Sequence, residues 1–262
     1  MHEREADAQH LRCIYQLIDL QVLKRDVDAL PTLIESAELM GFCGLNITHP
    51  CKQAVLPLLT ELSEEARAIG AVNTVRLTDG RRIGYNTDAS GFAESFRRGL
   101  PDAAVDRVVQ IGAGGAGAAT AYALLTLGVG HLAIYDVQPM RAAALVDNLR
   151  GRFAADRLSV AAELGGAIGA ARGIVHATPT GTREHPGMPV PIDCLRPDLW
   201  VADIVYFPLR TELLSRAAER GCRILDGGGM AIFQAAAAFE IFTGRKADRE
   251  RMLQGFRNTP DD

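Results

Sequence analysis

Paired cysteines are lacking from this sequence of 262 residues. Its five cysteines include no Cys-x-x-Cys pair and no cysteine–histidine cluster at the spacing that zinc sites use. They are Cys13, Cys43, Cys51, Cys194 and Cys222. Isolated thiols in an odd number exclude a disulfide framework, and they predict free cysteines in a reducing cytoplasm, with no bound metal.

Concentrated charge and uninterrupted apolar runs are lacking too. Lysine and arginine number 28 against 32 acidic residues, and no basic stripe is present, which excludes a nucleic-acid footprint. The first ten residues, MHEREADAQH, contain no apolar signal region. Residues 108–135 carry no Asp, Glu, Lys or Arg, but six glycines interrupt them, so the pattern predicts strand, loop, helix and strand and no membrane span.

The first third of the chain mixes helices with short strands. Apolar positions at helical spacing predict a helix over 26–40, and Asp79-Gly80 between two alternating stretches predicts a hairpin over 71–88. The other expected elements are helix 2–10, strand 13–20, strand 41–48, a helical stretch 52–68 broken at Pro57, and helix 89–100 before Pro101.

From residue 108 onward, apolar strands alternate with helices, which predicts a parallel sheet covered on both faces. Short strands are expected within 174–181, 200–206 and 222–227, and an apolar helix over 230–244 is closed by Gly244. We therefore predict an α/β protein of two domains. Residues 1–91 plus 228–262 form a discontinuous α/β substrate domain, and 92–227 form a Rossmann-type nucleotide domain with a doubly wound parallel sheet.

A glycine-rich loop provides the strongest local signal. Gly112, Gly114 and Gly117 form G-x-G-x-x-G between the strand VVQI and a helix, and a second strand ends at Asp136, 19 residues after Gly117. Such glycines let a diphosphate approach the N–H groups of a helix N-terminus. The predicted dinucleotide loop comprises Gly112, Ala113, Gly114, Gly115, Ala116 and Gly117.

Asp136 indicates which dinucleotide binds. A carboxylate at the end of the second strand accepts hydrogen bonds from the adenosine ribose and repels a 2′-phosphate. No arginine occurs in the next four residues, VQPM. We therefore expect NAD in preference to NADP; the alternative reading is that Asp136 caps the following helix.

The stretch GLNITHPCK (44–52) places Lys52 at the start of a helix, where the helix dipole disfavours a positive charge. Together with AVNT, NTDASGF, GAGGAG, ATPTG, DIVYFPLRTELL and LDGGGMAIFQAAAAF, it resembles the shikimate dehydrogenase family across nearly the whole chain. Asp136 and VYFP are most similar to its NAD-dependent quinate/shikimate dehydrogenase branch.

The resemblance implies reversible NAD-linked oxidation of the 3-hydroxyl of shikimate, quinate or both. Lys52 and Asp88 would be the catalytic pair, with Lys52 relaying the hydroxyl proton and Asp88 orienting it. The substrate ligands would be Asn46, Thr48, Asn73, Asn86, Tyr206 and Gln234. Further cofactor contacts would be Thr178, Pro179, Val205 and Gly227.

This sequence departs from the family pattern at two places. The opening MHE looks like the end of a loop that carries substrate-binding serines, so the first strand and those serines are expected to be missing, and residues 1–20 contain no serine. His176 and Thr182 stand where the family usually has Asn and Met, in a segment expected to line the nicotinamide side and to influence cofactor affinity. His176 could hydrogen-bond there, and our default interpretation is an ordinary histidine at a strand end.

The expected partners are a small-molecule substrate and a monomer or homodimer assembly, with no nucleic acid and no membrane. One alternative function is a catalytically weak NAD-binding sensor or regulatory paralogue. Another is a dehydrogenase of a different small hydroxy acid.

Overall fold

The computed structural model describes residues 1–257, and the chain divides into two compact units. Of the described residues, unit 1 comprises 1–87 and 232–257, and unit 2 comprises Asp88–Ala231. Helix α10 (Gly228–Thr243) begins in unit 2 and continues in unit 1. No helix in this part of the chain combines the length and apolarity needed to cross a membrane.

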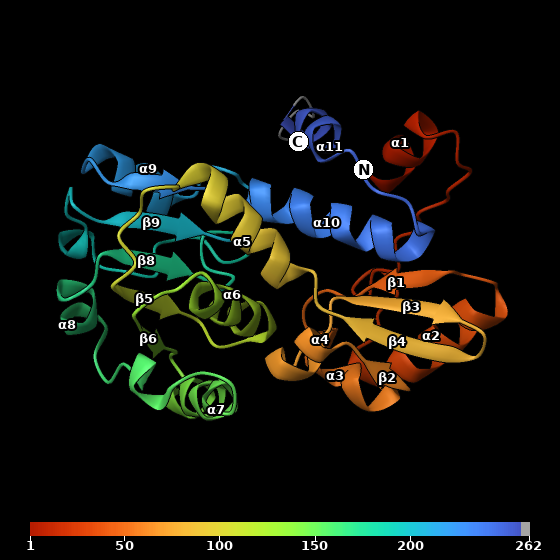
Figure 1. The fold of residues 1–262 in the computed structure, drawn as a ribbon, viewed down its shortest axis with the longest axis horizontal. Coiled ribbons are helices and arrows are strands. Elements are labelled where there is room, and N and C mark those ends of the chain that lie inside the picture. The colour runs from red at the N-terminus through yellow and green to blue at the C-terminus, as the bar shows by residue number, and fades with distance from the viewer. Residues whose placement is uncertain (258–262) are drawn as a thin grey trace. The chain divides into compact units, whose positions relative to one another are not determined.

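Unit 1 contains a four-stranded sheet in the order β1-β3-β4-β2 (Figure 1). Strands β3 and β4 form the predicted antiparallel hairpin, and Asp79 and Gly80 both have the positive φ that its tight turn requires. The strands are β1 (Gly44–Asn46), β2 (Glu61–Leu62), β3 (Thr74–Thr78) and β4 (Arg81–Tyr85). Its helices are α1 (His2–Ala8), α2 (Leu30–Leu39), α3 (Cys51–Ala54), α4 (Glu64–Ile69) and α11 (Arg249–Arg257), with 3₁₀ turns η1 (Val27–Ala29) and η2 (Leu56–Leu58).

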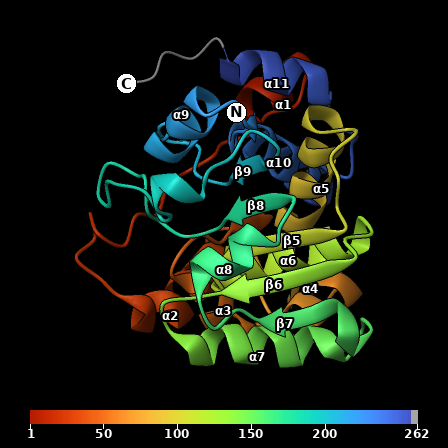
Figure 2. The same ribbon diagram turned by 90° about the vertical axis from the view of Figure 1, so that its left-hand side faces the viewer.

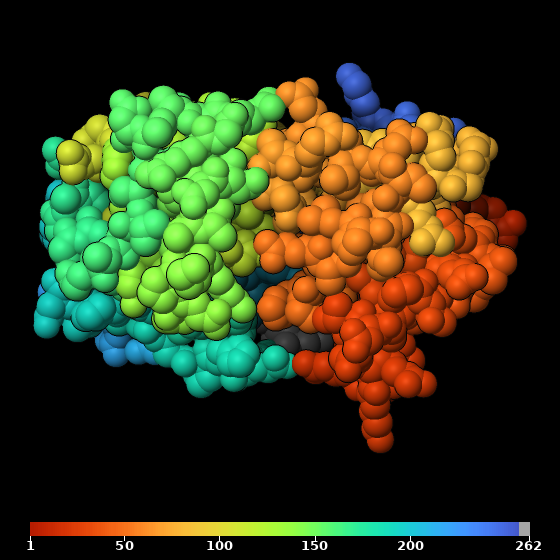
Figure 3. Space-filling view, turned by 90° about the horizontal axis from the view of Figure 1, so that it is seen from below, coloured from red at the N-terminus to blue at the C-terminus, as the bar shows by residue number. Residues whose placement is uncertain are grey.

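The predicted strand over 13–20 is wrong. Strand β1 pairs with β3 alone, and the segment 11–19 has no regular secondary structure. A strand needs a partner for its backbone N–H and C=O groups, and apolar composition does not supply one. Ile14, Leu17 and Val22 are exposed, and Figure 3 shows the red atoms of this N-terminal part at the surface.

The ends of unit 1 are joined through Glu5 on α1. Its side chain is fully buried and accepts hydrogen bonds from Arg251 at 2.9 and 2.8 Å and from the Asp248 N–H at 2.9 Å. Burial raises the pKa of Glu5, but the hydrogen bonds from Arg251, Asp248 and Gln9 more than offset it, so the pKa is lowered overall. Glu5 therefore contributes stability as a carboxylate.

Replacing Glu5 with Gln is expected to lower the Tm by about 2–5 °C at neutral pH, because the charge-assisted bonds to Arg251 are lost. The pKa of Glu5 is lower in the folded state than in the unfolded state. The stability that its carboxylate contributes is therefore complete above the pKa of the unfolded state, and it is lost as the pH falls through the pKa of the folded state. The Tm gap between wild type and variant should therefore close in acid. Thermal unfolding at several pH values measures it, with exposed Glu35→Gln as the control; an unchanged gap in strong acid would contradict this account.

Unit 2 is a six-stranded parallel sheet in the order β10-β9-β8-β5-β6-β7 (Figure 2). Its strands are β5 (Arg107–Ile111), β6 (His131–Tyr135), β7 (Leu158–Val160), β8 (Gly173–His176), β9 (Trp200–Asp203) and β10 (Arg223–Leu225). Its helices are α5 (Asp88–Gly99), α6 (Gly115–Thr126), α7 (Pro139–Arg150), α8 (Leu164–Gly169) and α9 (Glu212–Glu219), with 3₁₀ turns η3 (Ala155–Arg157) and η4 (Ile192–Cys194). The doubly wound parallel sheet predicted from the alternating pattern is confirmed, and β7, α8 and α11 are elements that the sequence reading did not include.

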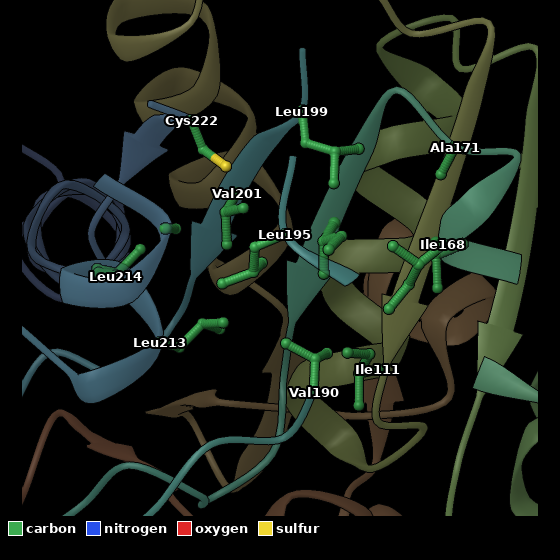
Figure 4. Close-up of a cluster of buried hydrophobic side chains, with 13 residues drawn as sticks. Ile111, Ile168, Ala171, Val190, Leu195, Leu199, Val201, Leu213, Leu214 and Cys222 are labelled. Carbon is green, nitrogen blue, oxygen red and sulfur yellow. The ribbon is translucent and has the colours of Figure 1, made fainter. Parts of the chain in front are cut away.

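Alternate residues of the central strands face the two layers of helices. Val109, Ile111 and Val201 pack with Ile168 of α8 and Leu213 of α9 in one core cluster, which Figure 4 shows. On the other face, the rings of Phe96 from α5 and Trp200 are nearly perpendicular, with a centroid distance of 5.0 Å. This two-sided burial explains why the strands read as continuous apolar runs.

Candidate active site

The two central strands of unit 2 mark the predicted nucleotide site. From β5 the chain winds in one direction through β6 and β7, and in the other through β8, β9 and β10. The switch point therefore lies between β5 and β8, whose carboxyl ends lead into Gly112 and Ala177. Ligands of open α/β sheets bind at such a point, because the loops that follow the two strands diverge there.

The glycine loop is shaped for close backbone approach. Gly112 has φ +106°, and a Cβ there would lie 2.4 Å from the Ala177 carbonyl oxygen; a Cβ at Gly117 would lie 2.4 Å from the Gly112 carbonyl oxygen. Gly114, the N-cap of α6, has open space where a Cβ would stand and provides no side-chain cap. This cradle and its uncapped helix N-terminus fit the diphosphate of a dinucleotide.

Gln110, on strand β5, stabilises this loop through hydrogen bonds. Its side chain is fully buried, and Nε2 donates to the carbonyl oxygens of Gly112 at 2.9 Å and Gly117 at 2.8 Å. Its Oε1 accepts from the Thr120 hydroxyl at 2.9 Å. The sequence reading missed Gln110, although a polar residue in the apolar strand VVQI, directly before the glycines, is a usable signal.

Asp136 follows β6 and holds two backbone groups. One carboxylate oxygen accepts from the Ala113 N–H at 2.9 Å, and the other accepts from the Gln138 N–H at 2.8 Å. Gln138 is the N-cap of α7, so this bond holds the residue before the helix, and α7 has no side-chain cap hydrogen bond. The bond to Ala113 also places a negative charge directly beside the glycine loop.

The loops after β8 and β9 are tied together by buried polar groups. His176 Nδ1 lies 2.9 Å from Asp203 Oδ1, and His176 Nε2 lies 2.5 Å from the Thr178 hydroxyl. Asp203 Oδ1 also accepts from the Val205 N–H at 3.0 Å. His176 is thus more than an ordinary histidine at a strand end, because each ring nitrogen has a polar partner in a fully buried setting.

The other predicted residues of unit 2 differ in exposure. Pro179 and Tyr206 are exposed, and the Tyr206 ring lies 5.3 Å from that of Phe207. A Cβ at Gly227 would lie 2.4 Å from the Ile204 and 2.5 Å from the Val205 carbonyl oxygens, so only glycine fits there. Asp88 is buried and is the first residue of α5.

Unit 1 gathers three of the predicted substrate ligands into one network of amides and hydroxyls. Asn73 Nδ2 donates to Thr87 Oγ at 2.9 Å and to Gln234 Oε1 at 3.3 Å. Asn46 Nδ2 donates to Thr74 Oγ at 3.3 Å, and that hydroxyl in turn donates to Asn73 Oδ1 at 3.1 Å. Thr74 and Thr87 are members that the sequence reading missed.

The remaining predicted residues of unit 1 are Asn86, Thr48 and Lys52. Asn86 is buried and its amide donates to the Ala71 carbonyl at 2.9 Å. Thr48 is exposed, and its carbonyl accepts from the Cys51 N–H at 2.8 Å, which starts α3. Lys52 is the second residue of α3, and its side chain is partly buried.

Comparison with known proteins identifies the family. Residues 1–75 match the shikimate dehydrogenase substrate binding domain, and residues 227–254 match the shikimate 5′-dehydrogenase C-terminal domain. A shikimate dehydrogenase (NADP(+)) of Streptomyces avermitilis is 56% identical over 97% of this chain and 88% of the relative. A quinate/shikimate dehydrogenase (NAD(+)) of Corynebacterium glutamicum strain R is 48% identical over 98% of this chain and 92% of the relative.

A solved structure agrees with the sequence relatives. Quinate dehydrogenase from Corynebacterium glutamicum in complex with NAD superposes with a TM-score of 0.90 at 46% identity, covering 98% of this chain and 93% of that one. The similarity thus extends through both units and includes the Rossmann-type nucleotide domain. This chain is a member of the shikimate dehydrogenase family.

Proposed function

We propose that this protein oxidises the 3-hydroxyl of shikimate or quinate reversibly, with a nicotinamide dinucleotide as the second substrate. The observation that carries the proposal is the amide and hydroxyl network of unit 1, in which Asn46, Asn73 and Gln234 are joined. A polyol carboxylate needs such groups, because each of its hydroxyls loses hydrogen bonds to water on binding. The activities named for the relatives agree with it.

Lys52 is the proposed proton relay. The bound nicotinamide would accept a hydride from the substrate carbon or return one to it. Lys52 would remove the hydroxyl proton in the oxidative direction and donate a proton to the developing alkoxide in the reductive one. Asp88, as a buried carboxylate, would orient the lysine side chain.

The glycine loop and the residues around it would hold the dinucleotide. Gly112, Gly114 and Gly117 leave room for the diphosphate at the N-terminus of α6. Thr178, Pro179, Val205 and Gly227 lie on the loops after β8, β9 and β10, where the nicotinamide half would bind. Thr48, Asn86 and Tyr206 would complete the contacts to the substrate.

The proposed cofactor is NAD, with NADP as the poorer substrate. Asp136 puts a carboxylate beside the glycine loop, where the adenosine ribose would bind, and the first arginine after it is Arg141. The NADP specificity named for the Streptomyces avermitilis relative argues the other way. The NAD named for the Corynebacterium glutamicum relatives supports our choice.

The test of the proposal is the initial rate of dinucleotide reduction, with shikimate and with quinate, at several concentrations of NAD and of NADP. Turnover of either acid supports the dehydrogenase. Binding of a dinucleotide without turnover of either acid would overturn the catalytic proposal and favour a sensor. If the protein is folded by circular dichroism but neither binds a dinucleotide nor turns over either acid, the cofactor assignment is overturned as well.

Asp136→Asn is expected to raise the ratio of kcat/KM for NADP to that for NAD by about tenfold or more, because the repulsion of a 2′-phosphate by the carboxylate is removed. Asp147→Asn provides a matched control, since Asp147 is an exposed carboxylate on α7 of the same unit. Steady-state kinetics with both cofactors measure the ratio. An unchanged ratio would show that Asp136 serves only its two backbone N–H groups.

A further inference from the structure

A continuous series of hydrogen bonds runs from the N-terminus of α9 to the turn after β8. Thr211, the N-cap of α9, accepts from the Leu214 N–H and donates its hydroxyl proton to Asp203 Oδ2 at 2.7 Å. Asp203 Oδ1 contacts His176 Nδ1, and His176 Nε2 contacts the Thr178 hydroxyl. The series joins segments up to 27 residues apart in sequence.

The chemistry of the groups gives this series a direction. A carboxylate oxygen accepts hydrogen bonds, so the ring nitrogen that faces Asp203, Nδ1, carries a proton and donates it. Nε2 lies within hydrogen-bond distance of the Thr178 hydroxyl, and that hydroxyl donates to the Thr180 hydroxyl at 3.2 Å. The Thr178 oxygen remains an acceptor and receives the Thr180 N–H at 3.3 Å.

The bond to His176 also decides which side of Thr178 faces the glycine loop. The Thr178 methyl carbon, Cγ2, would lie 2.8 Å from a Cβ at Gly112, next to the Ala177 carbonyl oxygen. The hydroxyl points to His176, so the methyl group is directed toward Gly112. If the bond to His176 were lost, the side chain could rotate and change the surface against which the glycine loop is packed.

The same carboxylate holds a second segment. Asp203 Oδ1 accepts from the Val205 N–H, and the Val205 carbonyl lies against Gly227. Thr178 and Val205 both belong to the segments proposed to contact the nicotinamide half. The His176–Asp203 pair therefore connects the two loops that would surround it.

We propose that His176, oriented by Asp203, is a positioning residue that fixes the Thr178 side chain against the glycine loop and thereby sets the affinity for the dinucleotide. This inference rests on the proposed function, since it assumes that the dinucleotide binds at this loop. His176 itself is fully buried, and it acts through Thr178.

Two substitutions separate the two bonds of His176. Asn places its amide near the position of Nδ1, so His176→Asn can keep the bond to Asp203 but cannot reach Thr178. Gln places its amide near the position of Nε2, so His176→Gln can keep the bond to Thr178. The expected result is a Kd for NADH about tenfold higher in His176→Asn, the size of one hydrogen bond, and within about threefold of wild type in His176→Gln.

Thr178 provides the independent check, because its substitution leaves the buried pair in place. Thr178→Val removes the hydroxyl and should weaken NADH binding about as much as His176→Asn. The double variant should bind no more weakly than either single one, because both remove the same bond. The KM for the hydroxy acid should stay near the wild-type value in all of them, which a general loss of structure would not allow.

The measurements are calorimetric or fluorescence titrations with NADH, or with NADPH if NADH does not bind, together with steady-state kinetics and the Tm. Equal losses in His176→Asn and His176→Gln, or additive losses in the double variant, would overturn the inference. So would an unchanged Kd in Thr178→Val, even if the His176 variants do not fold. A wild-type protein that binds neither dinucleotide would refute the proposed function itself, whereas normal binding by the variants refutes only the role of His176.

Discussion

Lys52→Ala is expected to lower kcat by about 10³-fold in both directions, within the range that a positioned acid–base group contributes. In the proposed mechanism the neutral amine of Lys52 takes the hydroxyl proton as the hydride leaves, and its ammonium form stabilises the alkoxide in the reverse direction; alanine can do neither. The Kd for the dinucleotide should be almost unchanged, since the proposed contacts of that ligand lie on unit 2. Stopped-flow or steady-state rates, together with NADH titrations, measure the two quantities separately.

Lys246→Ala is the matched control for this experiment, because Lys246 is an exposed lysine of the same unit. Added methylamine should restore part of the activity of Lys52→Ala and should leave Lys246→Ala unaffected. An activity of Lys52→Ala within tenfold of wild type would contradict the catalytic assignment. In that case Lys52 would be a structural ion-pair partner, and another group would have to move the proton.

Gly112→Ala is expected to weaken dinucleotide binding by at least about 100-fold and to lower the free energy of unfolding by about 2–4 kcal/mol. The new Cβ would lie 2.4 Å from the Ala177 carbonyl oxygen, at a φ of +106° that an alanine rarely adopts. The loop must therefore shift, and Gln110 and Thr178, which contact it, would be displaced with it. Chemical denaturation and NADH titration measure the two effects.

Substitutions at two further glycines separate the effect on dinucleotide binding from the effect on stability. A Cβ at Gly114 would meet no atom within 4 Å, so Gly114→Ala should leave stability almost unchanged and weaken dinucleotide binding, because the methyl group would occupy the space expected for the diphosphate. Gly169 on α8 also has open space, and Gly169→Ala should change neither property much. Normal NADH binding by Gly114→Ala would show that the diphosphate does not bind at the N-terminus of α6.

The local elements were predictable because short stretches of sequence determine them. The strand, glycine loop and helix around Gly112–Gly117 follow from the order of apolar residues and glycines alone. Asp79 and Gly80 form the hairpin turn because both tolerate positive φ, and Gly244, at φ +69°, follows the end of α10 for the same reason. None of these needs information from distant residues.

The failure at residues 13–20 has the opposite cause. The segment has the composition of a strand, but a strand exists only where a neighbour accepts and donates its hydrogen bonds, and β1 is paired on one side alone. The three-residue β7 was missed in the same way: it pairs with β6 over Leu158–Val160, and its own pattern is too short to be distinctive.

The sequence alone determined the family, the doubly wound sheet and the position of the glycine loop, since these depend on motifs whose residues are neighbours along the chain. Only the tertiary structure decided which polar side chains meet. Gln234 reaches Asn73 across 161 positions, and Asp203 reaches His176 across 27. The physical reason is that a buried polar group must find a partner, and which partner it finds depends on the packing of strands and helices that are distant in sequence. The role proposed for His176 depends on Asp203, which the fold places beside it on the neighbouring strand β9.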